Sequence, residues 1–309
     1  MPPKKRPATA DVSRLTVLAA SGDDRAFAAA ALEMLASKQR LQREATLDAL
    51  IEHPLPAVRD AIRALYFELD EDGLKRDQGA PMRVAIVRIL RAIHDTRDVD
   101  IAVRASDTRE VAFGEDIAWK LRVHGLALLA AIAPELFPYY AVEHLDDDRG
   151  IDGEPANSAF QLLSAMGHHV SIYQWLISGE RPPALVPVAV ELLREAPRPI
   201  LQRYIAAAVE QAVRTEDEPL ATVLAETIVK DEIADAYPSL ARLMSSKVSD
   251  ELYNYLAVLL ASTNRPPLLA ILEEQLHRGR RAKIVADALR IRRTDETAAV
   301  LRRWEDGDD

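Results

Sequence analysis

Apolar residues between positions 81 and 105 recur at helical spacing on both sides of a short polar turn. The segment reads PMRVAIVRILRAIHDTRDVDIAVRA, and its aliphatic side chains fall every three or four residues from Val84 to Ile93. That spacing is typical of one face of an amphipathic helix. Residues 94–97 form the turn, after which Val99, Ala102 and Val103 resume the pattern. A connection this short predicts two antiparallel neighbouring helices.

Variants of this segment recur along the chain. RVAIVRILRAI from Arg83 aligns without gaps with RVHGLALLAAI from Arg122, and related stretches start at Arg43, Ala156 and Val186. Looser matches occur near the C-terminus. The equivalent leucines lie 29–40 residues apart, except for one interval of 67 that spans two units; they are Leu50, Leu90, Leu129, Leu163, Leu193, Leu260 (or Leu259) and Leu289. The period predicts an all-α fold, an α-solenoid of about seven antiparallel helix pairs.

Three of these segments, AVRDAIRAL, MRVAIVRILRAI and LRVHGLALLAAI, resemble the second helix of HEAT repeats of the bacterial HEAT/armadillo type. Arg59 follows a valine, as in the pattern of that family, whereas Arg83 and Arg122 stand one place before the valine. The resemblance covers residues 40–300. It implies a HEAT-like superhelix but indicates almost nothing about function. Our leading prediction for the function is a non-enzymatic scaffold or adaptor for protein–protein interaction.

Composition and punctuation predict the domain organisation. The N-terminal sequence MPPKKRPATA combines prolines with Lys4, Lys5 and Arg6, so we expect residues 1–10 to be a disordered basic tail. No Gly-Ser linker divides the remainder of the chain, and we expect a single HEAT-like domain over residues 11–304, with a soft boundary near 179–183. Residues 305–309 form an acidic tail.

Three long connections separate the predicted first and second helices of successive pairs. They cover residues 71–80, 106–115 and 146–155, with net charges of −1, −2 and −4. We expect them on one edge of the stack, where loops on repeat scaffolds usually bind. The alternative is a set of tolerated insertions with solvated charge. The predicted partner-binding residues, for a protein partner that could be basic, are Asp107, Glu110, Glu115, Asp146, Asp147, Asp148, Asp152 and Glu154.

Charge is uneven along the chain. Residues 276–304 carry a net charge of +6, and the rest carries −16 of the overall −10. This segment is either a polar cap on the terminal repeat or a patch for an anion, a nucleic acid or the acidic edge of another copy. The predicted anion-binding residues are Arg278, Arg280, Arg281, Lys283, Arg290, Arg292 and Arg293. A nucleic-acid-binding or DNA-repair module is therefore the alternative function, although −16 elsewhere opposes a continuous basic groove.

The sequence offers little for catalysis. It has no cysteine, no G-x-S-x-G elbow and no glycine-rich phosphate loop. His144 stands near Asp146–Asp148, and histidine and carboxylate side chains can bind metal ions. Some HEAT-like enzymes bind iron through His-Glu dipeptides. This chain has only the reverse order, Glu-His, so the resemblance does not imply an iron site. We expect no catalytic residue, metal or cofactor, and no membrane-spanning segment. We expect a cytoplasmic protein, since a chain without cysteine suits a reducing compartment.

Overall fold

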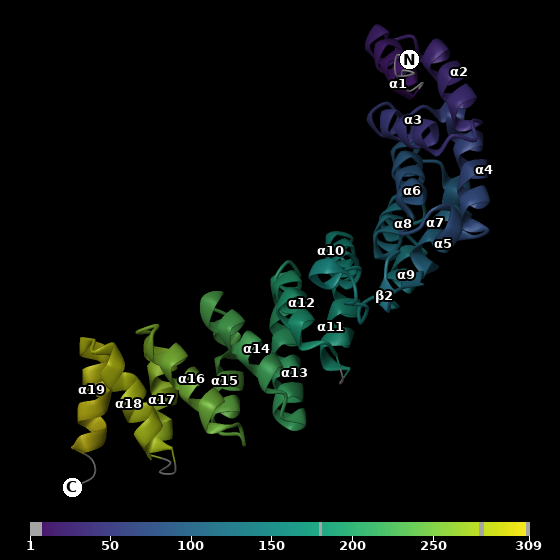
Figure 1. Ribbon diagram of the computed structural model, residues 1–309. Helices are drawn as coiled ribbons and strands as arrows, with labels where there is room; N and C mark the ends of the chain where they lie inside the picture. Colours follow the sequence, from purple (N-terminus) through teal and green to yellow (C-terminus); the bar gives the residue numbers. More distant parts are fainter. Residues whose placement is uncertain (1–7, 179–180, 278–280, 307–309) are drawn as a thin grey trace, which may run out of the picture. The chain divides into compact units, whose positions relative to one another are not determined.

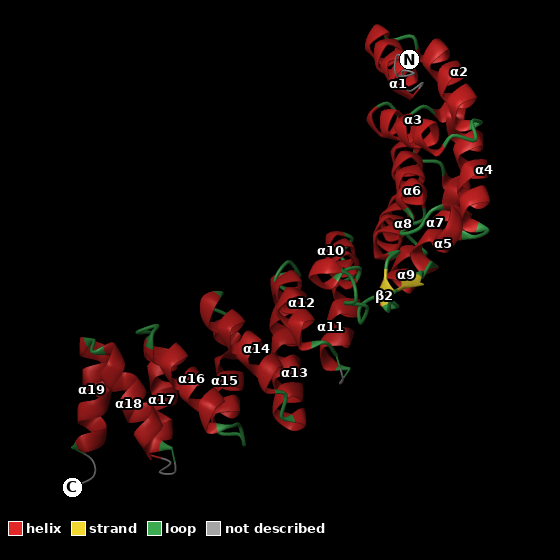
Figure 2. Cartoon of the chain, viewed as in Figure 1, coloured by secondary structure: helices red, strands yellow, loops and turns green. Residues whose placement is uncertain are grey.

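Helices make up most of the described chain (Figures 1 and 2). The computed structural model describes residues 8–178, 181–277 and 281–306. Within these ranges the β-structure is limited to one two-stranded hairpin. The predicted all-α class is confirmed. Residues 1–7 of the predicted basic tail and 307–309 of the predicted acidic tail lie outside the described residues.

The chain forms two compact units, residues 1–162 and 163–309. The first unit contains a hairpin and the three long connections between helices. Its elements are α1 (Ala8–Ser21), α2 (Asp24–Leu35), α3 (Arg40–Glu52), η1 (Pro56–Val58), α4 (Arg59–Asp70), α5 (Gly73–Arg76), α6 (Pro81–Ile93), η2 (Thr96–Asp98), α7 (Val99–Asp107), β1 (Val111–Ala112), β2 (Glu115–Asp116), α8 (Trp119–Ile132), α9 (Phe137–Val142) and η3 (Ile151–Gly153). Helix α10 (Ala156–Ala165) contains the division between the units.

In the second unit the regular elements of the described residues are all helices. Its elements are α11 (His169–Ile177), η4 (Pro183–Leu185), α12 (Val186–Leu193), α13 (Arg198–Thr215), α14 (Glu218–Lys230), η5 (Ala234–Ala236), α15 (Tyr237–Met244), α16 (Asp250–Ala261), α17 (Pro266–His277), α18 (Ala282–Arg292) and α19 (Asp295–Glu305).

Within each unit a helix packs against the helices one and two places away in sequence. In the first unit α1, α3, α6 and α8 contact one another in succession, and α2 and α4 lie beside them. In the second unit α11, α13, α15, α17 and α19 form one row, and α12, α14, α16 and α18 form the other. Each helix therefore buries its apolar face against near neighbours in sequence. The single domain predicted over residues 11–304 stays a prediction, since the two units are described separately.

The segment 81–105 folds as the pattern predicts. Pro81 occupies the first turn of α6, where its missing N–H costs nothing. The helix ends at His94, whose backbone adopts the left-handed region and donates to the carbonyl of Leu90. Helix α7 then begins after η2 and contacts α6. Its buried face consists of Ile101, Ala102, Ala105 and Ser106, one or two positions away from the face that the sequence pattern predicts.

The seven aligned leucines all lie in the hydrophobic core. Each of them, from Leu50 in α3 to Leu289 in α18, is 0 % exposed. Burying one leucine removes apolar surface from water and contributes ~1.5–3 kcal/mol before conformational entropy is subtracted. The helical spacing thus identifies the core positions correctly. None of the described helices combines the length and apolarity needed to cross a bilayer.

Helices α7 and α8 approach closely at Gly125. A Cβ atom at this position would lie 2.5 Å from the backbone nitrogen of Ser106 and 2.8 Å from the carbonyl carbon of Ala105. Those are backbone atoms of α7, which cannot move aside as a flexible side chain could.

We therefore predict that Gly125→Ala lowers the free energy of unfolding by about 1–3 kcal/mol, as overpacking does in a tight core. Glycine to alanine inside a helix without such a neighbour raises stability by about 0.5–1 kcal/mol. The sign of the change in urea midpoint, followed by circular dichroism, decides the matter. A stabilised variant would show that the two helices are not in close contact here.

Candidate functional site

The three long connections of the first unit are joined by two buried arginines. Arg83, in the first turn of α6, is 1 % exposed. Its guanidinium pairs with Asp70 at 3.0 Å, with Asp77 at 3.2 Å and with Glu110. Asp70 ends α4, Asp77 lies in the connection 71–80, and Glu110 lies in the connection that follows α7. Arg83 therefore holds the first two connections together.

Asp77 also accepts hydrogen bonds from the backbone at the start of α6. It is fully buried, and its carboxylate accepts hydrogen bonds from the backbone N–H groups of Met82 and Arg83 at 3.1 and 3.0 Å. These N–H groups belong to the first turn of α6, where unpaired donors and the helix dipole favour negative charge. Gly73 leaves space for the ion pair between Arg83 and Glu110. A Cβ atom at position 73 would lie 2.6 Å from Arg83 Nη2 and closer still to the Glu110 carboxylate.

Arg122 joins the second connection to the third. It lies in the first turn of α8 and is 0 % exposed. Its Nη1 donates to the carbonyl of Thr108 at 2.9 Å, and its Nη2 pairs with Asp116 and, at 3.3 Å, with Asp147. Thr108 precedes the hairpin and Asp116 lies in β2, whereas Asp147 lies in the connection 146–155. The expectation that the three connections share one region of the molecule is consistent with this chain of contacts.

The connection between α7 and α8 contains the hairpin, which the sequence pattern predicted as a loop (Figure 2, yellow). Val111 pairs with Asp116 and Ala112 with Glu115. The N–H of Ile117 donates to the carbonyl of Glu110 at 2.8 Å and closes the base. Phe113 and Gly114 form the turn, both with positive φ. Glu110 and Asp116 tie the two ends of the hairpin to Arg83 and Arg122.

The predicted partner-binding carboxylates divide into buried and exposed groups. Asp107, Glu115, Asp146, Asp148 and Asp152 are exposed, and Glu154 is partly exposed while accepting from the N–H of Ser158. We define these six as the acidic edge. Glu110 and Asp147 are 7 % and 5 % exposed. Their prediction as contact residues is corrected: both carboxylates sit inside the fold, because each neutralises a buried arginine.

His144 lies beside this network. It is 3 % exposed, and its Nδ1 is 3.7 Å from Asp147 Oδ2. Burial lowers the pKa of His144, and the nearby Arg122 lowers that pKa further. Its imidazole is therefore neutral in the folded protein at pH 7. Among the described residues no group of three or more histidine and acidic side chains is arranged to hold a metal ion.

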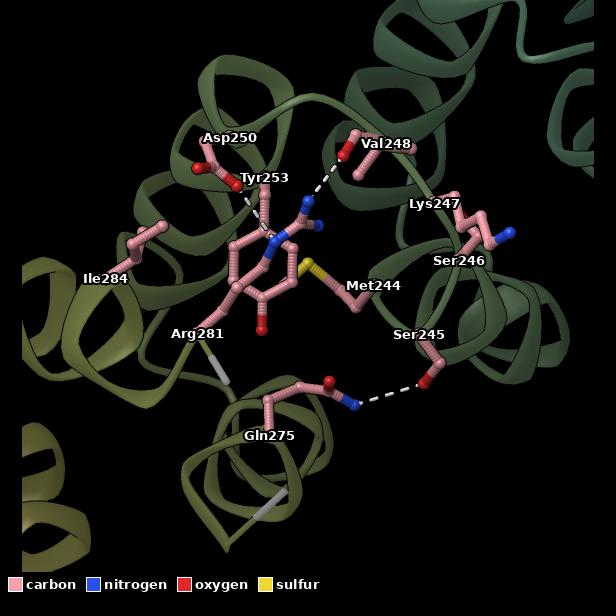
Figure 3. A pocket seen from close by; sticks show the side chains of 10 residues that line it. All are labelled: Met244, Ser245, Ser246, Lys247, Val248, Asp250, Tyr253, Gln275, Arg281 and Ile284. Atoms are coloured by element: carbon pink, nitrogen blue, oxygen red, sulfur yellow. Dashed lines mark hydrogen bonds and ion pairs between the residues drawn. The ribbon is translucent and has the colours of Figure 1, made fainter. Parts of the chain in front are cut away.

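The second unit has a cavity between α15, α16, α17 and the start of α18 (Figure 3). Its volume is about 450 Å³. Arg281 lies over the ring of Tyr253, with the guanidinium carbon 4.7 Å from the ring centroid, and donates to the carbonyl of Val248 at 2.6 Å. It also pairs with Asp250 at 3.0 Å, and Gln275 donates to Ser245 Oγ at 3.2 Å. The polar groups of this cavity mainly bind one another.

These contacts bear on the predicted anion-binding residues. Arg281 is engaged as described, and Arg290 pairs with Asp287 and Glu305. Arg278 and Arg280 lie outside the described residues. Lys283, Arg292 and Arg293 are exposed and form no ion pair with any described residue. Of the predicted set within the described chain, these three are the side chains still available to an anion.

Comparison with known proteins gives no assignment: the chain matches no family model, no curated protein and no solved structure. A function for this chain therefore has to be inferred from the chemistry of its described residues.

The buried network yields a stability prediction. We expect Arg122→Leu to lower the free energy of unfolding by ~3–5 kcal/mol, because Asp116 and Asp147 would be left buried without a counter-charge. Urea midpoints of the variant and the parent protein measure this effect. Arg97→Leu, which removes an exposed pair with Asp95, should change stability far less. Equal effects of the two substitutions would contradict the assignment.

His144 yields a second prediction. Since the folded state lowers the pKa of His144, the unfolded chain takes up a proton more readily once the pH falls below about 6.5. This histidine should therefore reduce the free energy of unfolding on acidification, by up to about 1.4 kcal/mol per pH unit below 6.5. We expect His144→Leu to lose less stability than the parent protein between pH 7 and pH 5. His277→Gln, at an exposed histidine, is the control. An unchanged pH dependence in His144→Leu would show that His144 is accessible to protons in the folded state.

Proposed function

We propose that this chain is a non-enzymatic scaffold that binds another protein through the acidic edge. In this proposal residues 11–304 form a HEAT-like α-solenoid of about seven helix pairs. The proposed location is the cytoplasm, in keeping with a chain that has no cysteine.

Ion pairs at a regular sequence distance support the repeat architecture. Arginine–carboxylate pairs link residues 30 to 39 positions apart in both units; they are Arg59–Asp98, Arg181–Asp217, Arg194–Asp231, Arg265–Glu232 and Arg303–Glu273. These distances fall within the 29–40 residue intervals between the aligned leucines. Each pair therefore joins equivalent places in successive helix pairs, as stacking of similar units would produce.

The observation that supports the binding function is that buried arginines hold the connections that bear the acidic edge. Arg83 and Arg122 fix the connections from below, while the six carboxylates of the acidic edge remain wholly or partly exposed. A loop held in one conformation loses less entropy on binding than a mobile loop. The helices use their apolar faces for packing, which leaves the connections to make outside contacts.

The charge of the acidic edge indicates a basic partner surface. Carboxylates clustered on one surface attract lysine and arginine side chains, which accelerates encounter and selects among partners. They repel phosphate, so the same surface disfavours nucleic acid. The partner class supported best is a protein with a basic patch.

The test is affinity capture with the full chain as bait. We expect one protein to be retained in stoichiometric amount, and expect its retention to weaken about tenfold or more for the combined variant Glu115→Gln, Asp148→Asn, Asp152→Asn. Higher salt should have a similar effect because it screens exposed charge. The control removes exposed carboxylates from the second unit instead, by Glu216→Gln and Glu251→Gln. Retention that is equal for both variants, or recovery of nucleic acid alone, would reject the proposal.

A further inference from the structure

Phe113 occupies a position that folding alone does not favour. It is 101 % exposed, as much as in an extended chain. It is the first of two turn residues in the hairpin, with φ of 55°, and Gly114 follows with φ of 84°. Two-residue turns of this kind prefer Asn, Asp or Gly because both central residues need positive φ. A bulky aromatic residue in the left-handed region is an outlier.

No contact within the described chain explains why residue 113 is aromatic. The side chain is fully accessible, so the ring buries no surface against this molecule. The turn points into open space, since a Cβ added at Gly114 would meet no atom within 4 Å. Val111, at the start of the same hairpin, is 62 % exposed. Backbone strain and exposed apolar surface both disfavour Phe113 in the isolated protein, which indicates that the ring serves a contact with another molecule.

The hairpin is held firmly although it is short. Two strands of two residues are not stable alone in water. Here the residue before β1, Glu110, pairs with Arg83, and Asp116 in β2 pairs with Arg122. The Ile117–Glu110 backbone hydrogen bond closes the base. An aromatic side chain on such a support loses little entropy on binding, which is typical of residues that dominate interface energetics.

The charges around Phe113 restrict the class of partner that it could contact. Glu115 lies two residues away and is exposed, as is Asp107 at the end of α7; Arg109 is the basic residue of this connection and pairs with Asp147 at 3.5 Å. An anionic membrane surface would repel such a tip, because insertion of a ring at a bilayer is normally assisted by Lys and Arg. A protein pocket with an apolar floor and a basic rim fits both the ring and the carboxylates.

We propose that the segment 111–116 is the anchor of the partner interface, and that Phe113 inserts into an apolar pocket bordered by Lys or Arg on a partner protein. The proposal rests on the proposed function and assigns its central contact.

The first test uses the purified chain alone. Phe113→Asn should leave the melting temperature unchanged or raise it, because Asn adopts positive φ more readily and no packing is lost. A clear fall in melting temperature would show that Phe113 supports the fold, and would overturn the proposal.

The second test identifies and measures the contact. The full chain carrying photoreactive p-benzoylphenylalanine at position 113 is irradiated in native lysate, with the same group at Tyr139, which is 72 % exposed on α9, as the matched control. The protein crosslinked from position 113 is then purified, and its affinity for the unmodified chain is measured by calorimetry. We expect Phe113→Ala to weaken binding about thirtyfold or more, and Tyr139→Ala to change it less than about threefold.

The outcomes separate this inference from the proposed function. The inference is supported if the crosslinked residues line an apolar pocket with a basic rim and Phe113→Ala weakens binding as stated. It is overturned if position 113 crosslinks only to lipid or to copies of this chain, if vesicles of phosphatidylcholine and phosphatidylserine bind the chain through Phe113, or if Phe113→Ala binds normally. Loss of binding in the acidic-edge variant together with normal binding by Phe113→Ala would retain the scaffold function and reject the anchor.

Discussion

Pairing of buried arginines with carboxylates is the constraint on which the first unit depends. Arg83 and Arg122 are among the largest fully buried side chains, yet each lies in the first turn of a helix, where irregular chain enters the packed layers. A buried guanidinium is costly unless nearby carboxylates match its charge. The matching groups come from the connections, through Asp77, Glu110 and Asp147. The irregular segments are thereby tied to the regular ones.

This arrangement divides the acidic residues of the connections by role. Residues adjacent in sequence differ in burial: Asp147 is buried against Arg122, while Asp146 and Asp148 are exposed. The buried member fixes the backbone, and the exposed members take their positions from it. A surface made of connections can therefore have a defined shape without an apolar core of its own, provided that its ion pairs are well enclosed.

Much of the fold can be predicted from the sequence. The 3.6-residue period located the helices, and the period of 29–40 residues located seven leucines that are all fully buried, because both signals arise from repeated burial of one helix face. The hairpin was missed because two residues per strand are too few to show a period of two, and its turn residues are Phe-Gly instead of Asn-Gly. In the sequence, Arg83 and Arg122 stand out only as positions of the repeat pattern. Their burial depends on Glu110 and Asp147, which lie 27 and 25 residues away in sequence and cannot be distinguished by spacing from the solvated carboxylates beside them.

The missed elements are those where local and global preferences disagree. A strand pair of this length, an aromatic residue at positive φ and a buried guanidinium are each unfavourable alone. They occur together within residues 83–122, and each depends on the next: the arginines need the carboxylates at the ends of the hairpin, and the hairpin needs the arginines. The local conformational preferences of a sequence usually agree with its overall fold, and exceptions are expected at functional sites. Because these departures are concentrated in one connection, this region, more than the regular helix faces, is the part of the molecule best suited to contact other molecules.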